Sequence, residues 1–410
     1  IWLTLCVSLK IVVIIMQNSD IFEKDRKYIA HTYHRFPAAV KSGNGAQAED
    51  FEGKRYIDFG SGIGTNSLGF CNDKWIQAVV SQVKQLQHTS NLFYTLPDSL
   101  LAERLCKVTG YSKVFFGNSG AEANEGAIKI ARKYGKEVKG DHCNRIITLE
   151  NSFHGRTITT LSATGQDIFH QHFFPFTEGF LYVPANDSYA LHEAMDDTVC
   201  AVMLELVQGE SGVNVLEKEY VKEAERVCRE KGILLIVDEV QTGVGRTGTF
   251  LCCEHYEVRP NVITLAKGLG AGLPIGAILM DKLTENILQT GDHGSTFGGN
   301  PVVCAGALEV LNQIANADFL AAVNSKSDYM REKLSALPHV TNVSGMGLMF
   351  GLTLEKDIKA GKIAEKCVEN GLLILTAKEK LRIMPPLNIS KEEIDTGFNI
   401  LRKCLSGALS

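Results

Sequence analysis

The feature that most constrains the fold is an alternation of short apolar runs with helical patterns between residues 75 and 305. The runs are bounded by polar residues and occupy positions 114–116, 146–149, 201–206, 233–240 and 262–265. Runs of this length that lack a polar face are typical of strands in a mainly parallel sheet. Between two of them, residues 219–232 carry Val221, Ala224 and Cys228 on one helical face and end in glycine. The alternation predicts an α/β domain whose mainly parallel sheet is covered by helices.

After about residue 302 the pattern changes. A long helical stretch through Leu334 leads into residues 343–354 (VSGMGLMFGLTL), whose alternation is typical of a half-exposed antiparallel strand. Ser390 and Glu393 form a capping box ahead of a last helix. The early segment AEDFEGKRYIDF predicts a hairpin that joins this C-terminal part. The expected divisions are an apolar leader at 1–15, an N-terminal arm and part of a smaller α+β domain at 16–74, a large domain at 75–305, and the rest of the small domain at 306–410.

The first fifteen residues are almost wholly apolar and stop abruptly before Met16. A membrane-spanning helix needs about 20 apolar residues, and this stretch is shorter and interrupted by Lys10. A secretory signal would begin with basic residues and end in a small-residue cleavage site, and neither is present. We therefore expect Met16 to be the physiological start, residues 1–15 to be upstream translation, and the protein to be cytoplasmic.

Charge and cysteine usage argue against several classes of partner. The chain has 42 basic and 47 acidic residues, a formal net charge of −5, and no long basic run. It therefore lacks the positive surface that binds a nucleic-acid backbone. Eleven cysteines are scattered from Cys6 to Cys404 without a CxxC pair, which predicts reduced thiols rather than disulfides or a metal site. We expect no nucleic acid, no membrane and no metal.

One glycine motif suggests a nucleotide-binding enzyme, but its surroundings disagree. Residues 243–248 (GVGRTG) fit the G-x-G-x-x-G spacing and follow an apolar strand. A dinucleotide fingerprint must also open a helix and be followed, about 20 residues later, by an acidic residue. The segment TFLCCEHYEVRP that follows has no helical stripe, so an NAD-dependent oxidoreductase is disfavoured. No GxxxxGK[ST] segment occurs either, which argues against a nucleotide hydrolase of that type.

A different set of residues points to a common chemistry. Residues 115–124 (FFGNSGAEAN) predict a strand and a small-residue turn that opens a helix, whose positive end attracts anions. Asp238 ends one apolar strand, and Lys267 follows another, where a desolvated lysine becomes a nucleophilic amine. Taken alone, each feature also has a structural explanation: the turn is a tight strand–helix junction, Asp238 is a capping carboxylate, and Lys267 is a solvated lysine at a strand end. Together they are what a pyridoxal-phosphate site requires.

Longer segments then resemble a known family. These are SNLFYT, FFGNSGAEANEGAIKIARKYG, FHGRT, IVDEVQTGVGRTG, LAKGLGAGLPIGA, HGSTFGGNP and LRIMPPLNIS. From about Ile21 onward the chain resembles the class III, fold-type I pyridoxal-phosphate aminotransferases. The resemblance implies one pyridoxal 5'-phosphate per subunit, held as a Schiff base on Lys267, which also moves the proton during transfer. The cofactor-binding residues that it implies are Ser119, Gly120 and Ala121 at the phosphate, Phe153 on the ring face, Asp238 at the ring nitrogen, Gln241 at the ring hydroxyl, and Glu239, Val240, Lys267 and Thr296.

The same resemblance implies how substrates are held. Arg156 would hold the carboxylate far from the reacting amine, and Arg382 the α-carboxylate of glutamate or 2-oxoglutarate. Arginine suits both tasks because its planar fork pairs bidentately with carboxylates. Glu210 would pair with Arg382 in one half-reaction and swing aside in the other, so it counts with Lys267 and Asp238 among the catalytic residues. Ser295 would contact substrate, and Thr296 would reach the phosphate of a neighbouring subunit, which implies a homodimer.

Within this family, SNLFYT and the short N-terminal arm favour one branch. Its members transfer the terminal amino group of N2-acetyl-L-ornithine to 2-oxoglutarate, forming N-acetyl-L-glutamate 5-semialdehyde and L-glutamate in arginine biosynthesis. Ornithine, succinylornithine, succinyl-diaminopimelate and 4-aminobutyrate stay open as alternative donors. The sequence departs from the family pattern at Leu206, in place of the proline of E-P-x-x-G-E, and at Phe297, in place of the tyrosine of STYGGNP. Neither position carries an assigned chemical role.

Overall fold

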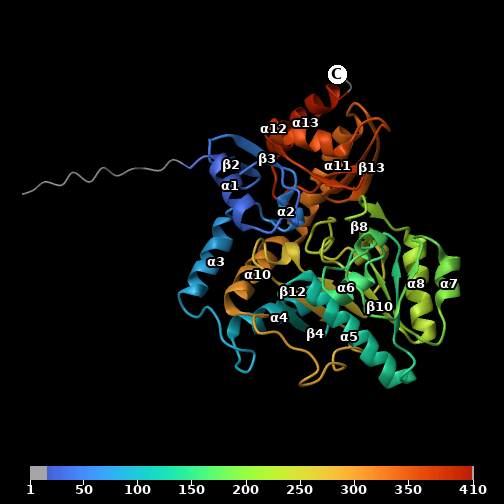
Figure 1. The fold of residues 1–410 in the computed structure, drawn as a ribbon. Coiled ribbons are helices and arrows are strands. Elements are labelled where there is room, and N and C mark those ends of the chain that lie inside the picture. Colours follow the sequence, from blue (N-terminus) through green and yellow to red (C-terminus); the bar gives the residue numbers. More distant parts are fainter. Residues whose placement is uncertain (1–15, 409–410) are drawn as a thin grey trace, which may run out of the picture.

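The structure is a computed structural model that describes residues 16–408. The apolar leader at 1–15, on which the hypothesis of upstream translation depends, lies outside the described residues. Figure 1 shows a larger unit built around β10 and α5 and a smaller unit in which the blue N-terminal strands lie beside the red C-terminal elements. The larger unit holds the sheet predicted from the apolar runs, and the smaller unit brings the two parts of the chain together.

The larger unit contains a seven-stranded sheet in the order β4-β12-β11-β10-β7-β5-β6. Its strands are β4 (Lys113–Gly117), β5 (Arg145–Leu149), β6 (Phe180–Val183), β7 (Val199–Leu204), β10 (Leu234–Asp238), β11 (Val262–Leu265) and β12 (Gly276–Met280). The neighbours from β6 to β11 pair in parallel, whereas β12 runs antiparallel to both β11 and β4. The predicted mainly parallel α/β sheet is therefore confirmed.

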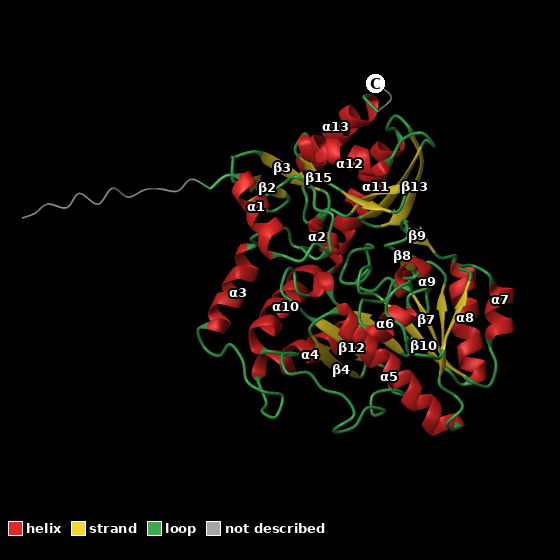
Figure 2. Ribbon diagram, in the orientation of Figure 1, coloured by secondary structure: helices red, strands yellow, loops and turns green. Residues whose placement is uncertain are grey.

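Helices cover both faces of this sheet, as Figure 2 shows. Ile236 of β10 packs in one apolar cluster with α5 (Gly120–Lys139), and the adjacent Leu235 packs in another with α8 (Lys218–Lys231). Successive side chains of a strand point to opposite faces, so an uninterrupted apolar run fills both clusters. The other helical segments outside the C-terminal part are α1 (Asn18–Tyr28), α2 (Ser61–Gly64), α3 (Asp73–Val83), α4 (Leu96–Thr109), α6 (Ile158–Ala163), η1 (Asp167–Phe169), α7 (Ser188–Ala194), α9 (Cys253–Tyr256), η2 (Lys267–Leu269) and α10 (Pro301–Ile314).

The smaller unit joins the two ends of the described chain. One sheet has the order β1-β2-β3-β15 and the other has the order β13-β14-β17-β16. The strands are β1 (Val40–Asn44), β2 (Gln47–Asp50), β3 (Arg55–Asp58), β13 (Val340–Met346), β14 (Met349–Leu354), β15 (Leu372–Leu373), β16 (Leu375–Ala377) and β17 (Lys380–Ile383), covered by helices α11 (Ala317–Ser335), α12 (Ala360–Glu369) and α13 (Lys391–Ser406). Because β15 pairs in parallel with β3, the predicted early hairpin does join the C-terminal part. The exact domain boundaries stay a prediction.

Two expectations for the C-terminal part were wrong in detail. The single long helix is two helices, because Asn316 Oδ1 accepts a hydrogen bond from Phe319 N at 2.8 Å and caps a new helix there. The expected half-exposed strand at 343–354 is a hairpin, which turns at Gly347 with φ +55°. Its second strand, β14, is buried because it lies between β13 and β17. The capping box of Ser390 and Glu393 is confirmed.

The glycine motif at 243–248 lies in a turn after β10. A chain of turn hydrogen bonds runs through it, including Gly248 N to Gly245 O at 3.1 Å, and the next helix is the four-residue α9. A dinucleotide fingerprint opens a longer helix than this, so the structure agrees with the argument against an NAD-binding segment. Between residues 16 and 408, no helix is both long and apolar enough to cross a membrane. A short two-stranded ribbon, β8 (Val207–Gln208) with β9 (Asn214–Val215), completes the fold.

Candidate active site

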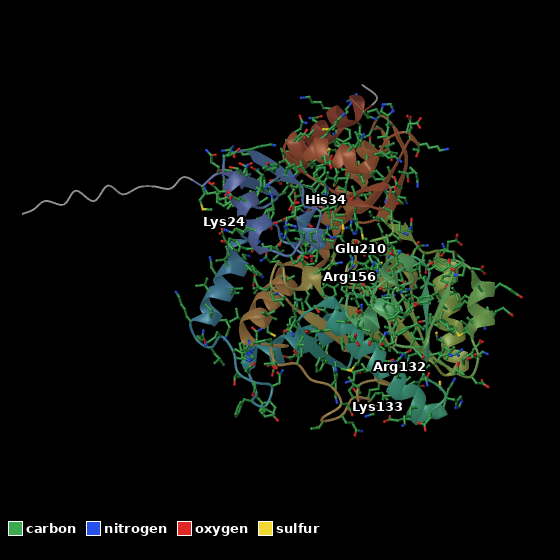
Figure 3. All side chains as sticks on the ribbon, viewed as in Figure 1. Lys24, His34, Arg132, Lys133, Arg156 and Glu210 are labelled. Atoms are coloured by element: carbon green, nitrogen blue, oxygen red, sulfur yellow. The ribbon has the colours of Figure 1, made fainter. Side chains whose placement is uncertain are left out.

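A cavity of about 580 Å³ lies at the carboxyl ends of the parallel strands. Asp238 ends β10, Glu205 directly follows β7, and Lys267 comes two residues after β11, so strand direction alone brings these side chains to one edge. The predicted residues that line the cavity are Ser119, Gly120, Ala121, Phe153, Arg156, Glu210, Asp238, Val240, Gln241 and Lys267. Figure 3 labels Arg156 and Glu210, which both line this cavity, in the region where the two units meet.

Asp238 is held rigidly by donors from three elements. Its Oδ2 accepts hydrogen bonds from Asn124 Nδ2 at 2.7 Å and from His154 Nδ1 at 2.8 Å, and its Oδ1 accepts one from Val240 N at 3.0 Å. Asn124 is itself fixed, because its Oδ1 accepts a hydrogen bond from Thr264 Oγ1 at 2.7 Å. All these polar groups are buried. The carboxylate is therefore aimed into the cavity with little freedom to turn.

Lys267 supplies an amine at the same edge of the sheet. Burial lowers the pKa of Lys267, and the nearby carboxylates of Glu210, Asp238 and Glu205 only partly oppose this effect. No hydrogen bond or ion pair joins Lys267 Nζ to another residue in the described part of the chain. A desolvated amine without a partner deprotonates more readily, and it can then act as a nucleophile or accept a proton.

The turn before α5 forms the opposite end of the cavity. Ser119 caps this 20-residue helix, and its Oγ accepts a hydrogen bond from Glu122 N at 3.2 Å. The first N–H groups of a helix have no partner within it, so they form an anion site at the positive end of the helix dipole. A Cβ at Gly120 would come within 2.7 Å of Val240 Cγ1. Glycine therefore lets the anion-binding turn approach the end of β10 closely.

An aromatic pair holds Arg156 at the side of the cavity. Its guanidinium lies over the Phe169 ring at 4.2 Å from the centroid and beside the Phe153 ring at 5.4 Å. The backbone N–H of Phe153 donates to Glu205 Oε2 at 2.7 Å, which fixes this arm to the end of β7. Among residues 16–408, no carboxylate pairs with Arg156, so its donors are free to bind a carboxylate.

The second predicted arginine lies behind a carboxylate. Arg382 on β17 is 3% exposed and does not line the cavity; its Nη1 donates to Glu210 Oε1 at 2.6 Å. Gln241 Nε2 donates to the same oxygen at 3.1 Å. Burial opposes ionisation of Glu210, but the charge and hydrogen bond of Arg382 outweigh it, so the pKa of Glu210 is lowered. An ionised Glu210 therefore lies between Arg382 and the cavity.

Besides Arg382, three predicted residues do not line this cavity. Glu239 points to the other side of the strand end, where its carboxylate accepts hydrogen bonds from Cys252 N and Cys253 N at 2.6 and 2.8 Å. Successive residues of an extended segment alternate in direction, which explains why Asp238 faces the cavity and Glu239 does not. Ser295 and Thr296 line a separate hollow of about 430 Å³, although Ser295 Oγ accepts a hydrogen bond from Asn118 Nδ2 at 3.0 Å.

The structure also adds residues that sequence reasoning missed. Asn124 and His154 orient Asp238, Glu205 anchors Phe153, and Tyr33 lines the cavity from the N-terminal arm. Burial and the nearby Asp238 raise the pKa of Glu205 well above its ordinary value. Asn124 and His154 lie inside segments that resemble the family, and for Asn124 a polar residue on a buried helix face was an available signal. Tyr33 carried no such signal.

The lining fits pyridoxal 5'-phosphate. The turn before α5 can hold a phosphate, and Asp238 can face a protonated ring nitrogen. The Phe153 ring offers a flat apolar face, and Gln241 Oε1 is buried without a partner in the described chain, available to a hydroxyl donor. Lys267 is the free amine that an aldehyde requires. The part of the chain that the structure describes contains no group of three metal-ligating side chains.

Comparison with known proteins gives a consistent result. The family model described as aminotransferase class-III matches residues 28–405. The chain is 50% identical to the acetylornithine aminotransferase of Haemophilus ducreyi, covering 95% of this chain and all of the relative, and 46% identical to that of Caldanaerobacter subterraneus, covering 93% and 98%.

Solved structures agree with this comparison. The ornithine aminotransferase from Toxoplasma gondii has a TM-score of 0.90 at 35% identity, covering 95% of each chain. The N-acetylornithine aminotransferase from Stenotrophomonas maltophilia has a TM-score of 0.82 at 34% identity, covering 95% of this chain and 99% of that one. With the family match over nearly the whole length and the buried amine at the strand ends, the chain belongs to the class-III aminotransferases, which depend on pyridoxal 5'-phosphate.

Proposed function

We propose that this enzyme transfers the terminal amino group of N2-acetyl-L-ornithine to 2-oxoglutarate, giving N-acetyl-L-glutamate 5-semialdehyde and L-glutamate. The observation that carries the proposal is the contrast between a free arginine, Arg156, and a masked one, Arg382, in one site. A donor with one carboxylate needs one arginine, and an acceptor with two carboxylates needs both. The names of the relatives at 50% and 46% identity support acetylornithine as the donor.

The cofactor would be held by residues already described. Ser119, Gly120 and Ala121 would bind the phosphate, Phe153 would cover the ring, and Lys267 would be the point of covalent attachment. When bound, pyridoxal 5'-phosphate supplies an electron-withdrawing ring that stabilises negative charge at the carbon bearing the substrate's amine. Asp238, fixed by Asn124 and His154, would keep the ring nitrogen protonated. Gln241 would donate or accept at the ring hydroxyl, and Val240 would pack beneath the ring.

Lys267 would also carry the proton. Burial lowers its pKa, which favours the neutral form, and a neutral amine can take a proton from the carbon next to the substrate nitrogen. Held at the strand end in the cavity, the same amine would be able to return that proton later in the transfer.

Glu210 would choose between the two substrates. While it pairs with Arg382 at 2.6 Å, the cavity presents a carboxylate rather than a guanidinium to the amine end of the donor, which carries no carboxylate. When 2-oxoglutarate binds, its α-carboxylate competes for Arg382, and Glu210 moves aside while keeping Gln241 as an alternative partner. Arg156 would hold the distal carboxylate in both half-reactions. One site can thereby accept substrates of different charge.

We also propose a homodimer in which the loop carrying Ser295 and Thr296 completes the partner's phosphate site. In a single chain these residues lie outside the cavity of Lys267. Large apolar side chains near this loop are exposed, including Leu92 at 88%, Phe93 at 68% and Phe297 at 61%, an arrangement typical of an interface. Analytical ultracentrifugation would measure whether the protein is a dimer. Phe93→Glu should dissociate the dimer and weaken retention of the cofactor, whose phosphate site would lose the partner's loop. A monomeric wild type that retains the cofactor fully would contradict the proposed dimer.

A cytoplasmic location stays a prediction.

A panel of donors with 2-oxoglutarate tests the function directly. We expect most glutamate from acetylornithine, less from succinylornithine and succinyl-diaminopimelate, and least from ornithine and 4-aminobutyrate. A preference for ornithine, the donor in the name of the Toxoplasma relative, would keep the reaction class but overturn acetylornithine as the substrate. No activity with any donor would refute the proposal. Borohydride reduction followed by peptide mass spectrometry should place the cofactor on Lys267.

A further inference from the structure

A buried guanidinium in the turn after β10 joins the two units of the molecule. Arg246 is 2% exposed, and its Nη1 donates to Leu348 O at 2.9 Å and to Pro385 O at 2.6 Å. Its own carbonyl accepts a hydrogen bond from Leu348 N at 3.0 Å. Leu348 lies in the turn between β13 and β14, and Pro385 follows β17. A single side chain of the larger unit therefore binds two segments of the smaller one.

One of these contacts lies three residues beyond Arg382. The same end of β17 is held from the N-terminal side, because Ser61 Oγ donates to Met384 O at 2.6 Å and Met384 N donates to Phe59 O at 2.7 Å. Arg246 Nη2 also lies 3.5 Å from Ser61 Oγ. The backbone that carries Arg382 is thus fixed by bonds that do not involve the cavity or any substrate.

The side chain of Arg382 is held much less securely. Apart from Glu210 at 2.6 Å, its Nη1 has only a long contact of 3.4 Å to Gly209 O, and its buried Nε has no partner within residues 16–408. When Glu210 moves aside, the alignment of Arg382 with the cavity depends on where β17 lies relative to the larger unit. Displacements of about 1 Å in such a contact are enough to weaken binding strongly.

We propose that Arg246 is a positioning residue for the acceptor: it fixes β17 against the larger unit so that Arg382 stays aligned after Glu210 has left. The inference rests on the proposed roles of Arg382 and Glu210. It assigns Arg246 no contact with substrate or cofactor. It predicts that loss of Arg246 weakens the binding of dicarboxylates more than the binding of a donor with one carboxylate.

The surroundings explain why an arginine is needed here. Nη1 of the planar guanidinium donates to the carbonyls of Leu348 and Pro385 while Nη2 of the same rigid group lies 3.5 Å from Ser61 Oγ, whereas a lysine ammonium is a compact point charge on a flexible stem. Burial lowers the pKa of Arg246, and the charge of Asp58 opposes that effect. Asp58 Oδ1 accepts hydrogen bonds from Gly60 N and Ser61 N at 2.8 Å, which ties the same carboxylate to the N-terminal anchor of β17.

The test compares Arg246→Lys with a matched control, Arg331→Lys. Arg331 also binds two carbonyls of the smaller unit, Val343 O at 3.1 Å and Gly345 O at 2.8 Å, but it contacts β13 and not β17. The probe is glutarate, a five-carbon dicarboxylate that cannot react, with its dissociation constant measured by calorimetry on the holoenzyme. We expect Arg246→Lys to weaken glutarate binding and to raise KM for 2-oxoglutarate about 10-fold, with KM for acetylornithine nearly unchanged. Arg331→Lys should leave all three constants as in the wild type.

A milder variant covers the case in which Arg246→Lys does not fold. Ser61→Ala removes the bond to Met384 O and should weaken glutarate binding about 3-fold with the same selectivity. The inference would be overturned if Ser61→Ala and folded Arg246→Lys both bound glutarate as tightly as the wild type. It would also be overturned if these variants raised KM for the donor and KM for the acceptor by the same factor. A wild-type enzyme inactive with every donor would refute the proposed function instead, so the two failures are distinguishable.

Discussion

The two arginines of the site are held in opposite ways. Arg156, on the loop after β5, is exposed, lies over two aromatic rings and has no carboxylate partner in the described chain. Arg382, on β17 of the smaller unit, is 3% exposed and paired with Glu210. A guanidinium that binds every substrate, as proposed for Arg156, needs only a fixed position at the cavity. One that serves a single half-reaction must be neutralised for the rest of the cycle, because a buried unpaired charge is costly.

The largest expected effect comes from removing the amine of Lys267, on which both half-reactions are proposed to depend. Lys267→Ala should lower turnover by about 10⁴-fold or more with every donor and acceptor, since general acid–base catalysis alone contributes up to that amount. Steady-state glutamate production measures the loss, and borohydride reduction should no longer attach the cofactor to the protein. A Lys267→Ala enzyme with normal turnover would contradict the assignment of the amine.

Changing Arg382 should separate the two half-reactions. Arg382→Lys loses the bidentate fork and should raise KM for 2-oxoglutarate about 30-fold or more, as expected when one partner of a buried charge pair is weakened. The single-turnover reaction with acetylornithine, followed by the absorbance of the cofactor, should change little because Arg156 is intact. An equal loss in both half-reactions would show that the two regions are not specialised as described.

Changing Phe169 should affect the exposed arginine more than the masked one. Phe169→Leu removes the ring at 4.2 Å from Arg156, and a cation–π contact is worth about 0.5–2 kcal/mol, or about 2- to 30-fold in KM. Both acetylornithine and 2-oxoglutarate should bind more weakly, whereas N-acetylputrescine, which lacks the carboxylate, should be unaffected. Ile168→Ala, at an exposed neighbouring position, is the control. Weaker use of N-acetylputrescine by Phe169→Leu would point to general damage of the loop.

The smallest expected effect is a pH-dependent difference in stability. The pKa of Glu210 is lowered in the folded protein, so its pairing with Arg382 stabilises the fold above the ordinary pKa of about 4.3 and is lost as pH falls through the lowered value. Glu210→Gln should therefore melt at a lower temperature than the wild type near pH 7, and the difference should shrink on acidification below about pH 4. Scanning calorimetry of both proteins checks this. A constant difference at all pH values would argue against the ion pair.

Local sequence patterns predicted the centre of the site better than its edges. Asp238 and Lys267 were predictable because strand direction places any residue that follows a parallel strand at one edge. The alternation that separates Glu239 from Asp238 was readable in principle, but an apolar run gives no sign of which side faces the cavity. Arg156, Arg382 and Glu210 came only from the resemblance to the family, since nothing local marks them as substrate contacts.

The features that could not be predicted depend on contacts between distant segments. Arg246 and Pro385 are separated by 139 residues, and the donors on Asp238 come from Asn124 and His154, 114 and 84 residues away. No periodicity records such pairs, because each partner has an ordinary local environment. The break between α10 and α11 was missed for a related reason. Asn316 caps α11, but the helical spacing of the apolar residues continues across it, so the sequence pattern predicts one helix.

The parallel pairing of β15 with β3 has a consequence for how the enzyme is made. A ribosome that has completed residue 305 has already synthesised Asp238, Lys267 and the anion-binding turn, whereas β3 still has an open edge that only residues 372–373 can close. Pairings over such separations form slowly, and open strand edges invite aggregation. The nascent chain therefore contains Lys267 long before it contains Arg382, the arginine proposed to bind the acceptor.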